Sequence, residues 1–506
     1  MKIKMIFPPS RYTARVTNIP PAGIAKVTGF LRSKGHEVDQ DDLHAKAIHL
    51  NSSKLLLSQG IDMSILYDED RVARYLSGQK DQQIDTFVTK TLDTTSLKEY
   101  DAICFSVILQ WQAYSSMLLA KRIKEIMGVP IIFGGVSSSV IMSEKFISIP
   151  VVKSIVEDVR AHKLYRMFEP QEISEQIPDY DGLPLHLYKH KGFGNHFALY
   201  YELDTGCLYK CGFCTFRVRK AYHHMDPQKA VMEIEMLQKK YKTNLFELGT
   251  DMINSNYDLL HEFCDTLIAK NLGIKWLSFA SPAKLDEKTL EKMAASGCHL
   301  LKYGIESGSD RILRLMRKPF NIEQASRVLK AGKKVGIYST INIITGFPHE
   351  TAEDIKSTIN FIFQHEKELD IIRVNRFTLL KSSDMEQHPE QYGIKNIRPI
   401  NPVDLAFDEI GGLTWSEKRQ QINRSFRTIK QASHKAAITM KKLPCYPRPI
   451  PRVFPYIMHR YFLALAHQCH ALGAYVNSPS WLNMRQKPQH LLPHTTIRPL
   501  EFDEIL

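Results

Sequence analysis

The chain has 506 residues, of which 43% are hydrophobic and 24% are charged, a balance typical of a folded protein. This composition excludes collagen-like, low-complexity and wholly disordered chains, and the length leaves room for roughly three domains. The first residues hold only a short apolar run before Pro8 and Pro9, too little for the apolar centre of a secretory signal. We therefore expect a cytoplasmic protein.

The positive charge is concentrated near the C-terminus. The formal net charge is +13, and residues 418–500 contain 14 Lys and Arg but no Asp or Glu. The residues before this segment are close to neutral. The basic character therefore belongs to one region and not to the whole protein.

Residues 1–165 alternate short apolar runs with amphipathic stretches. The predicted strands are 2–7, 37–39, 101–108 and 131–133, and the predicted helices are 23–34 and 113–127. This βαβ rhythm predicts an α/β domain with a doubly wound, Rossmann-like parallel sheet, which binds ligands at the C-terminal ends of its strands. A purely structural α/β domain is the alternative.

Turn-forming residues in 166–195 predict a linker, after which the alternation resumes in 196–385. The predicted strands there are 197–203, 244–249, 274–279, 299–305, 337–344 and 371–379, and the predicted helices are 227–240, 257–270, 286–296, 321–334 and 351–365. Six βα units predict a partial (β/α)6, TIM-like barrel with its working face at the strand C-termini. We expect residues 386–506 to form a basic and mostly helical C-terminal region.

Three of the eight cysteines cluster directly after the first predicted barrel strand. They stand in Thr205-Gly-Cys207-Leu-Tyr-Lys-Cys211-Gly-Phe-Cys214, a C-x3-C-x2-C spacing. Three thiolates on one loop suit an iron–sulfur cluster with one iron left open. Structural zinc normally takes four closed ligands, for which His223 and His224 are the nearest additions.

At these residues the sequence resembles the radical S-adenosylmethionine (SAM) superfamily, whose hallmark is this triad with an aromatic residue, here Phe213, just before the last cysteine. Three further segments at strand ends resemble the family in the same order. They are Phe246-Glu-Leu-Gly-Thr-Asp251-Met-Ile-Asn254, Tyr303-Gly304-Ile-Glu306-Ser307-Gly308-Ser309 and Thr345-Gly346-Phe-Pro348-His-Glu350-Thr351.

The resemblance implies that Cys207, Cys211 and Cys214 hold a 4Fe-4S cluster whose fourth iron binds SAM. An electron from a donor such as flavodoxin or ferredoxin would then release a 5′-deoxyadenosyl radical, which abstracts hydrogen from an unactivated carbon. The residues that the resemblance places at the cofactor are Phe213, Asp251, Gly304, Glu306, Ser307 and Gly346.

Several of these residues also have a structural interpretation. Glu306 could pair with Lys302, Asp251 could cap the following helix, and Gly346 could shape a βα turn. Where relatives often place an arginine after the third strand, this chain reads Phe279-Ala-Ser-Pro282-Ala-Lys284, which leaves the carboxylate of SAM without an obvious partner.

The N-terminal domain resembles that of the cobalamin-binding radical SAM enzymes. The resemblance rests on Phe7-Pro8-Pro9, the segment Gly29 to Val38, Ser106, and Gly134-Gly135. It implies that Ser106, Gly134 and Gly135 contact cobalamin. The segment Asp42-Leu-His44-Ala-Lys-Ala47 only imitates the cobalt-ligating pattern of other cobalamin proteins, and Ile155-Val-Glu157-Asp-Val-Arg160 stands where relatives have a Gly-Glu-Gly-Glu turn.

The basic region interleaves its charges with aromatic residues and has three functional interpretations. The favoured one is a cap over the barrel mouth that binds an anionic substrate, such as a phosphorylated, carboxylated or peptide molecule. A membrane-surface helix at 454–476 is the second, and a nucleic-acid surface is the third and least favoured. A solvated basic face without a role is the remaining alternative.

Together these features predict a radical SAM enzyme, most simply a cobalamin-dependent methyltransferase that acts at an unactivated carbon of a secondary-metabolite, peptide or lipid-like substrate. The alternative within enzymes is a radical cyclisation, rearrangement or oxidation without methyl transfer. From another class, the alternative is a nucleic-acid-binding or scaffold protein with a structural metal. We expect no nucleic acid as partner, and leave peripheral membrane contact open.

Overall fold

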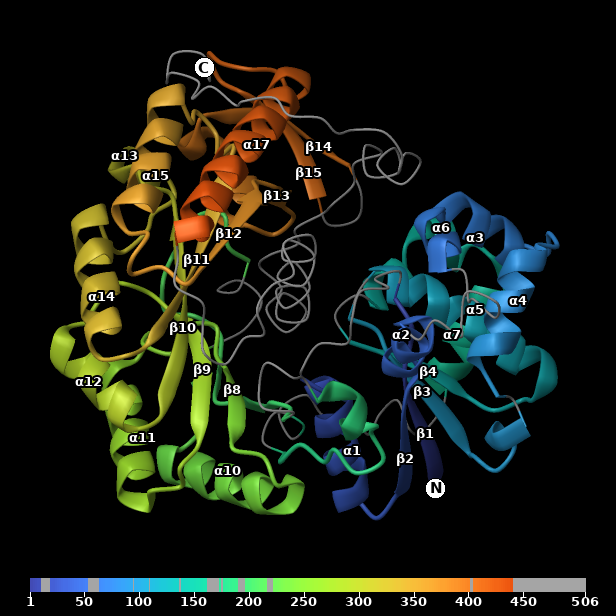
Figure 1. The fold of residues 1–506 in the computed structure, drawn as a ribbon. Coiled ribbons are helices and arrows are strands. Elements are labelled where there is room, and N and C mark those ends of the chain that lie inside the picture. Colours follow the sequence, from blue (N-terminus) through green and yellow to red (C-terminus); the bar gives the residue numbers. More distant parts are fainter. Residues whose placement is uncertain are drawn as a thin grey trace, which may run out of the picture.

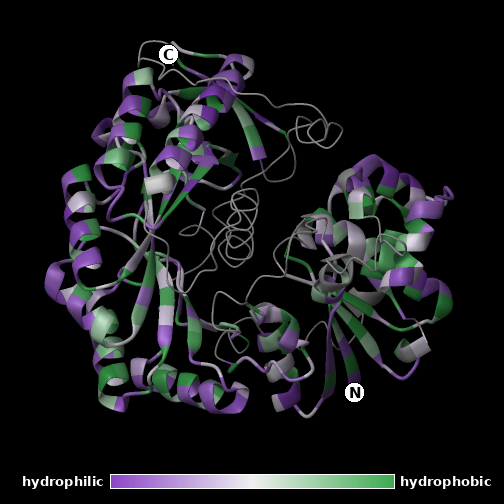
Figure 2. Ribbon diagram, viewed as in Figure 1, coloured by the Kyte–Doolittle hydropathy of each residue, from purple (hydrophilic) through white to green (hydrophobic). Residues whose placement is uncertain are grey.

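The computed structural model describes residues 1–10, 19–52, 63–93, 95–108, 110–135, 138–161, 173, 176–189, 196–215, 222–400 and 404–439. Two α/β units stand side by side, each built on its own parallel sheet (Figure 1). In both units the strands are rich in hydrophobic residues, whereas the surrounding helices carry hydrophilic outer faces (Figure 2). This patterning is that of sheets covered by amphipathic helices.

The N-terminal sheet is parallel and has the order β2-β1-β3-β4. Its strands are β1 (Lys2–Phe7), β2 (Glu37–Asp42), β3 (Ala102–Ser106) and β4 (Ile131–Gly134). Its helices are α1 (Ala22–Ser33), α2 (Leu43–Ser52), α3 (Glu69–Leu76), α4 (Gln82–Thr91), α5 (Gln110–Ile126), α6 (Glu144–Ile147) and α7 (Pro150–Ala161). The chain moves outward on both sides of β1, so the doubly wound sheet is confirmed and its switch point lies between β1 and β3.

The two faces of this sheet belong to different cores. Ile6, Ile103 and Phe105 pack beneath the N-terminal helices in one cluster. Ile3 and Met5 point the other way, into a cluster that continues through α1 into the outer core of the second unit. The two units therefore share buried apolar surface, and α1 lies between them (Figure 1).

Residues 176–189 bind the two units together. The amide of Asp179 donates to the carbonyl of Ala25 at 2.9 Å, and its carboxylate lies 2.8 Å from Arg32 of α1. Gly29 faces this segment so closely that a Cβ would stand 2.5 Å from the carbonyl oxygen of Ile177. Gly29 is thus required for packing of the connection, whatever else it does.

The second sheet has six parallel strands in the order β12-β11-β10-β9-β8-β5. The strands are β5 (Leu199–Glu202), β8 (Leu245–Gly249), β9 (Lys275–Ala280), β10 (Cys298–Glu306), β11 (Tyr338–Thr345) and β12 (Ile371–Arg376). The helices are α10 (Pro227–Tyr241), α11 (Tyr257–Lys270), α12 (Glu287–Ala295), α13 (Asp310–Leu315), α14 (Ile322–Lys334) and α15 (Ala352–Gln364). The expected partial barrel is confirmed, with β5 and β12 as its edges.

The residues that follow the barrel are less helical than expected. They begin with a small antiparallel sheet made of β13 (Leu379–Leu380), β15 (Asp404–Glu409) and β14 (Ile394–Pro399). The helices α16 (Asp384–Gln387) and α17 (Trp415–Thr439) complete this part. The strands escaped prediction because they are short and β14 reads Ile-Lys-Asn-Ile-Arg-Pro, without strict alternation. Residues 440–506, with most of the basic region, lie outside the described part.

Helix α17 is anchored to the barrel by a buried lysine. Lys418 has no exposed side-chain surface, lies 2.8 Å from Glu409 and donates to the carbonyl of Phe347 at 2.9 Å. The beginning of the acid-free segment is therefore part of the folded unit. No described helix combines the length and the apolar character needed to cross a bilayer.

Candidate active site

The three clustered cysteines lie on the loop that follows β5, at the C-terminal edge of the barrel. No disulfide joins them. The amide of Gly212 donates to the carbonyl of Met316 at 3.1 Å, and a Cβ on Gly212 would stand 2.2 Å from the hydroxyl of Tyr392. Phe213 is buried with Met316 and Tyr392 in a small apolar cluster against which Cys211 packs. The loop is therefore held by packing beneath its middle.

The two histidines considered as zinc ligands belong to a short strand. Residues His223–His224 form β7, which pairs with β6 (Asp204–Thr205). Within the described residues, no three His, Cys, Asp or Glu side chains converge closely enough to hold one metal ion. An iron–sulfur cluster requires no such convergence, because each thiolate binds a different iron.

A buried ion pair lies beside the cysteine loop. Lys318 is 3.2 Å from Glu306, and both side chains are 6% exposed. The ammonium of Lys318 also lies 5.4 Å from the ring centre of Phe213. Burial lowers the pKa of Lys318, but the negative charges of Glu306, Cys211 and Cys214 keep it above its ordinary value. The predicted pairing of Glu306 with Lys302 is wrong, because Lys302 pairs with Glu247 instead.

The backbone aims the carboxylate of Glu306 toward the mouth of the barrel. The register between β10 and β11 shifts between Gly304 and Glu306, and Glu306 has a left-handed φ of 69°. A β-bulge re-aims a side chain in this way, and such backbone strain is concentrated at functional sites. A Cβ on Gly304 would stand 2.6 Å from Glu306 Oε1 and 3.3 Å from Lys318 Nζ. Gly304 thus leaves the room that the ion pair occupies.

Asp251 follows β8 and lies next to another carboxylate. Its amide donates to Asp204 Oδ1 at 3.2 Å. Burial and then the charge of Asp251 raise the pKa of Asp204. The proposed helix cap at Asp251 is wrong, because Asn256 caps α11 by accepting from the amide of Leu259. Asp251 therefore remains at the strand end, with no role in starting the helix.

Asn254 connects two loops at the barrel mouth. It is fully buried; its side-chain amide donates to the carbonyls of Ser281 and Ala283 at 2.9 and 2.7 Å, and its side-chain oxygen accepts from Ser281 N at 2.9 Å. This amide fixes the loop after β9, where relatives place an arginine. Lys284, the cation of that loop, is exposed.

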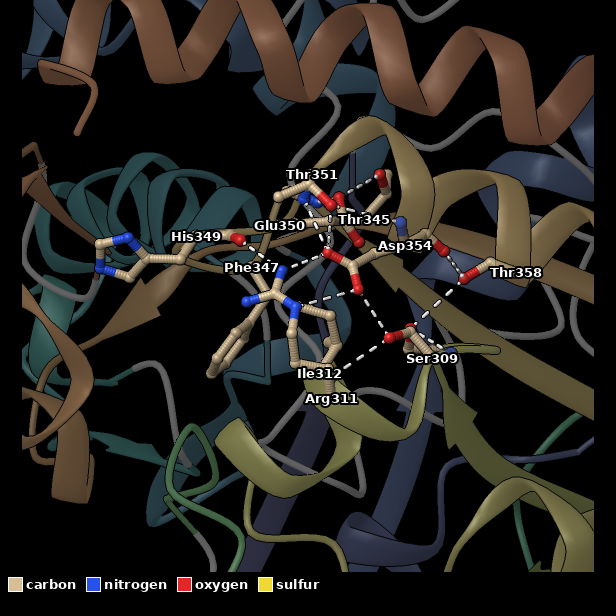
Figure 3. A network of polar contacts seen from close by, with 12 residues as sticks. Ser309, Arg311, Ile312, Thr345, Phe347, His349, Glu350, Thr351, Asp354 and Thr358 are labelled. Atoms are coloured by element: carbon tan, nitrogen blue, oxygen red, sulfur yellow. Dashed lines mark hydrogen bonds and ion pairs between the residues drawn. The ribbon is translucent and has the colours of Figure 1, made fainter.

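A polar network joins the ends of β10 and β11 (Figure 3). Asp354 accepts from Thr351 and from the hydroxyl of Ser309 and pairs with Arg311. Nearby, Thr358 accepts from the amide of Gly308 at 2.9 Å. The network explains why two loops far apart in sequence keep a fixed relative position.

Two residues predicted to contact the cofactor take part in this framework. Ser307 has no exposed surface, and its hydroxyl lies 3.3 Å from that of Thr358. The amide of Gly346 donates to Glu350 at 2.6 Å, and a Cβ on Gly346 would collide with Ile422 of α17. Both residues therefore have structural contacts of their own, Ser307 through its hydroxyl and Gly346 through its amide and its lack of a side chain.

The predicted residues of the N-terminal sheet gather at the C-terminal ends of its strands. Ser106 ends β3, and Gly134 and Gly135 end β4, where both glycines are exposed. Gly135 has φ of 98° and would place a Cβ 2.6 Å from the carbonyl oxygen of Val107, whereas a Cβ on Gly134 would meet no atom of the described residues within 4 Å. Gly135 is thus required by the turn, and Gly134 leaves open space.

The Asp42-Leu-His44 segment is engaged in contacts of its own. Asp42 is fully buried and accepts from the amide of Ala45 and the hydroxyl of Tyr188. His44 Nδ1 accepts from the amide of Ser10 at 3.1 Å. Glu157 of the second departing segment lies within helix α7 and not in a turn.

Residues 201–362 match the family model described as the radical SAM superfamily. These residues form a radical SAM domain. They begin in the middle of β5, contain the cysteine loop and end in α15, and thus hold four of the six barrel strands in full. A radical SAM domain implies a 4Fe-4S cluster and SAM, and the donor set fits both. Three thiols lie on one loop, and Glu306 Oε2 is a buried oxygen without a hydrogen-bond partner among the described residues.

Curated relatives are similar over part of the chain. An uncharacterized methyltransferase of Pyrococcus horikoshii is 29% identical over 197 residues, which is 38% of this chain and 41% of that protein. The anaerobic magnesium-protoporphyrin IX monomethyl ester cyclase of Rubrivivax gelatinosus is 31% identical over 156 residues, 30% of this chain and 28% of the cyclase. The chain thus spans less than half the length of these relatives.

A solved structure extends the similarity to the whole architecture. The cobalamin-dependent SAM radical enzyme OxsB, solved with aqua-cobalamin bound, superposes with a TM-score of 0.58 at 14% identity. The match covers 92% of this chain and 72% of OxsB. At this identity the likeness establishes the fold, in which a doubly wound domain stands beside a radical SAM domain.

Sequence reasoning missed several residues that the fold brings to the radical SAM domain. Lys318 and Tyr392 support the cysteine loop, Arg373 is buried in a barrel strand, and Glu247 is the buried partner of Lys302, which the sequence did not indicate. For Arg373 a signal was present, because it stands between apolar residues at the start of a predicted strand. For Lys318 no such signal exists, since Arg-Lys-Pro after a helix is an ordinary surface pattern.

Proposed function

We propose that this protein is a cobalamin-dependent radical SAM methyltransferase that acts at an unactivated carbon. The proposal rests on two sites in one chain, each formed at the C-terminal ends of the strands of a parallel sheet. One belongs to the radical SAM domain and holds the cysteine loop, and the other belongs to a doubly wound sheet with the open position Gly134. In this proposal 1–165 binds cobalamin, 166–195 connects, 196–385 is the catalytic barrel and 386–506 is a basic cap.

When bound, the cluster and SAM supply a 5′-deoxyadenosyl radical, and cobalamin supplies a methyl group. The part of Cys207, Cys211 and Cys214 is to hold the cluster so that one iron stays open toward the barrel. Packing of Phe213 and Gly212 fixes the loop, which favours a single cluster position. The domain thereby orients the reaction and excludes water.

The chain's own contribution to SAM binding centres on Glu306. Its positive φ and its partner Lys318 hold the carboxylate in one direction, with Oε2 left as an acceptor for a hydroxyl group. Asp251 supplies a second acidic group at the end of β8. Gly304 keeps the space above β10 clear, while Ser307 and Gly346 keep the loops in position.

In the N-terminal domain, Ser106, Gly134 and Gly135 have small or no side chains. The flat corrin ring of cobalamin can therefore lie directly against their backbone. His44 follows β2 and accepts a hydrogen bond from the amide of Ser10, so we do not propose it as a cobalt ligand. We further propose a cytoplasmic enzyme that receives electrons from flavodoxin or ferredoxin and acts on a secondary-metabolite, peptide or lipid-like substrate.

The experiment that tests the proposal is product analysis. The anaerobically purified protein, loaded with iron, sulfide and hydroxocobalamin, is incubated with SAM, a reductant and candidate substrates. Formation of both S-adenosylhomocysteine and 5′-deoxyadenosine supports methyl transfer by a radical route. If a protein with a full iron content forms neither of the two products, the proposed reaction is wrong.

The second candidate is a radical cyclisation, rearrangement or oxidation without methyl transfer. The similarity to a magnesium-protoporphyrin ester cyclase favours this candidate over a nucleic-acid-binding or scaffold role. In that case 5′-deoxyadenosine forms, or SAM is consumed, without S-adenosylhomocysteine. The same assay therefore decides between the two reactions.

A further inference from the structure

Helix α17 lies along β12, the last strand of the barrel (Figure 1). One side of the helix faces the loop after β11, because Gln421 donates to the carbonyl of Glu350 at 3.1 Å. Residues two positions apart lie on nearly opposite sides of a helix, and Asn423 accepts from Arg376 Nε of β12 at 2.9 Å. Since β12 is an edge of its sheet, this second side of α17 borders the part of the barrel that no described strand closes.

The second side of α17 collects positive charge around one aromatic ring. The guanidinium carbon of Arg376 lies 3.9 Å from the ring centre of Phe426, and Lys430 Nζ lies 5.4 Å from the same centre. Arg427 follows Phe426 directly and is exposed. Burial and then the positive charge of Arg427 lower the pKa of Arg376, and burial and then the charge of Arg376 lower the pKa of Lys430. Arg376 is therefore near enough to both other cations to be repelled by them.

Arg376 and Arg427 pair with no carboxylate among the residues that the structure describes. Their own helix offers none beyond its first turn, because residues 418–500 contain no Asp or Glu. By contrast, Arg311 and Arg317, which follow β10, each pair with an aspartate. The two terminal nitrogen atoms of Arg376 make no hydrogen bond in the described part of the chain, and neither is fully buried. They are thus open to a ligand.

A half-buried arginine without a counter-charge carries a free-energy cost. Burial disfavours the charged form, and positive neighbours disfavour it further. Arginine does not lose its proton in proteins, so the charge of Arg376 persists. An anion bound between Arg376 and Arg427 would remove both sources of this cost. The arrangement therefore indicates a site for a negatively charged ligand.

We propose that Arg376 and Arg427 form a phosphate-binding site at the open side of the barrel, which anchors the phosphate group of a small phosphorylated substrate. This inference deepens the proposed function and rests on it for the role of the bound molecule. Two guanidinium groups balance the two negative charges of a phosphate monoester, whereas a monocarboxylate balances one. A planar guanidinium also binds two phosphate oxygens through parallel hydrogen bonds.

The register of the strands sets the reach of such a substrate. Arg376 is aligned with Thr345, and Ile343, two residues earlier on β11, is aligned with Glu306 of β10. At ~4.8 Å between neighbouring strands, the backbone of Glu306 lies about 10 Å to the side of Arg376. The phosphate group is therefore separated by several bonds from the carbon that reacts near the cysteine loop.

Glycerol 3-phosphate and glycerate test the choice of anion, because both are small three-carbon molecules and one carries a phosphate where the other carries a carboxylate. We expect glycerol 3-phosphate to raise the melting temperature of the full-length protein in a saturable way, at constant ionic strength set with sodium chloride. Glycerate should bind several-fold more weakly. Equal binding of the two, or no saturable shift with glycerol 3-phosphate, overturns the proposal.

A matched pair of variants locates the binding. Arg427 and Arg327 of α14 are both exposed arginines within helices, so replacing either by Gln removes the same charge. Arg427→Gln should weaken binding of glycerol 3-phosphate by about tenfold or more, the usual effect of losing hydrogen bonds to a charged group, and Arg327→Gln should leave it unchanged. Equal binding by these two variants would contradict the site.

Two further measurements separate the site from an effect on folding. Without phosphate, Arg427→Gln should keep or raise the melting temperature, because it removes the charge that repels Arg376. A variant that is stable but binds poorly cannot owe its loss of binding to unfolding. Arg376→Lys keeps the positive charge without the planar fork and should also bind glycerol 3-phosphate more weakly. Unchanged binding in Arg376→Lys would exclude the paired hydrogen bonds.

Anionic macromolecules provide the opposing outcomes. Vesicles of phosphatidylcholine with and without phosphatidylglycerol, and a short RNA oligonucleotide, are tested with the same variants. Binding to vesicles or RNA that depends on Arg376 and Arg427, without binding of glycerol 3-phosphate, would make these residues part of a membrane or nucleic-acid surface. That result would overturn a site for a small phosphorylated substrate.

Iron is counted in the same samples. A full iron content without phosphate binding would remove this site and leave the proposed function untouched. Missing iron with intact phosphate binding would remove the proposed function, and with it the role of the phosphate, but not the site. The two inferences can therefore fail separately.

Discussion

Lys318 lies 3.2 Å from Glu306, and this buried ion pair joins the end of β10 to the surroundings of the cysteine loop. Removing one partner leaves an uncompensated buried charge, which typically costs about 3–5 kcal/mol. Lys318→Met should therefore lower the free energy of unfolding by roughly that amount. The surface pair of Lys334 with Glu287, whose side chains are 71% and 47% exposed, provides the control.

Urea unfolding at neutral pH measures both variants. Lys334→Met should leave the free energy of unfolding nearly unchanged, because solvent screens an exposed ion pair. Equal effects of the two substitutions would show that the buried pair contributes nothing particular to the site.

Gly304 leaves space for this ion pair, so a methyl group at this position should displace the carboxylate of Glu306. A Cβ at Gly304 meets Glu306 Oε1 at 2.6 Å, whereas a Cβ at Gly332 in α14 meets only Tyr303 at 3.8 Å. Gly304→Ala should displace the carboxylate and weaken SAM binding, measured by equilibrium dialysis of the loaded protein. Gly332→Ala should keep SAM binding and gain up to about 1 kcal/mol of stability. Unchanged binding in Gly304→Ala would remove Glu306 from the SAM site.

Stability should depend on pH through Glu350. Burial raises the pKa of this carboxyl to about 7, against the hydrogen bond from Gly346 and the charge of Lys418. The folded state then holds a proton that the unfolded state loses near pH 4.5. The contribution of Glu350 to the free energy of unfolding is therefore fully present below pH 4.5. It falls by about 3 kcal/mol as the pH rises to 7.

Glu350→Gln should flatten the stability profile between pH 4.5 and 7. Asp354→Asn should lower stability at neutral pH and change the slope of the profile only below pH 3.8, because Arg311 and Ser309 outweigh burial and hold the pKa of Asp354 at about 2. Chemical unfolding across this pH range measures both. An unchanged slope in Glu350→Gln would show that another group carries the dependence.

The open space at Gly134 gives a test of the cobalamin site that spares the fold. A Cβ at Gly134 or at Gly128 meets nothing within 4 Å, but only Gly134 stands at the C-terminal end of β4. Gly134→Phe should abolish cobalt retention after loading with hydroxocobalamin, and Gly128→Phe should retain it. Elemental analysis measures the cobalt content of both variants. If both retain cobalt, cobalamin does not bind at the C-terminal end of β4.

Most strands and helices could be predicted from the sequence, because the residue patterns that indicate them are local. The strand predicted at 2–7 is β1, the helix predicted at 257–270 is α11, and every predicted barrel strand exists. Parallel, buried strands read as apolar runs, and the helices between them show a regular apolar period. The cysteine spacing is also a local pattern, which is why the triad was found directly.

The pairings could not be read in this way because they are long-range. Glu306 pairs with Lys318 and not Lys302, since a bulge and a positive φ turn its carboxylate toward the segment that follows α13. Lys302 instead reaches across β9 to Glu247 on β8. The sheet of β13, β14 and β15 was missed because its strands are short and lack a regular alternation.

The central claim is that the cysteine loop holds an iron–sulfur cluster in a protein that also retains cobalamin. Anaerobic reconstitution with iron, sulfide and hydroxocobalamin, followed by metal counting, tests it most directly in the native chain, Cys211→Ala and Cys264→Ala. Cys264 is a buried cysteine of α11 outside the loop. The account predicts about four irons per chain in the native protein and in Cys264→Ala, with cobalt in all three, and loss of iron in Cys211→Ala alone. Zinc in place of iron, or equal iron in the two variants, would contradict it.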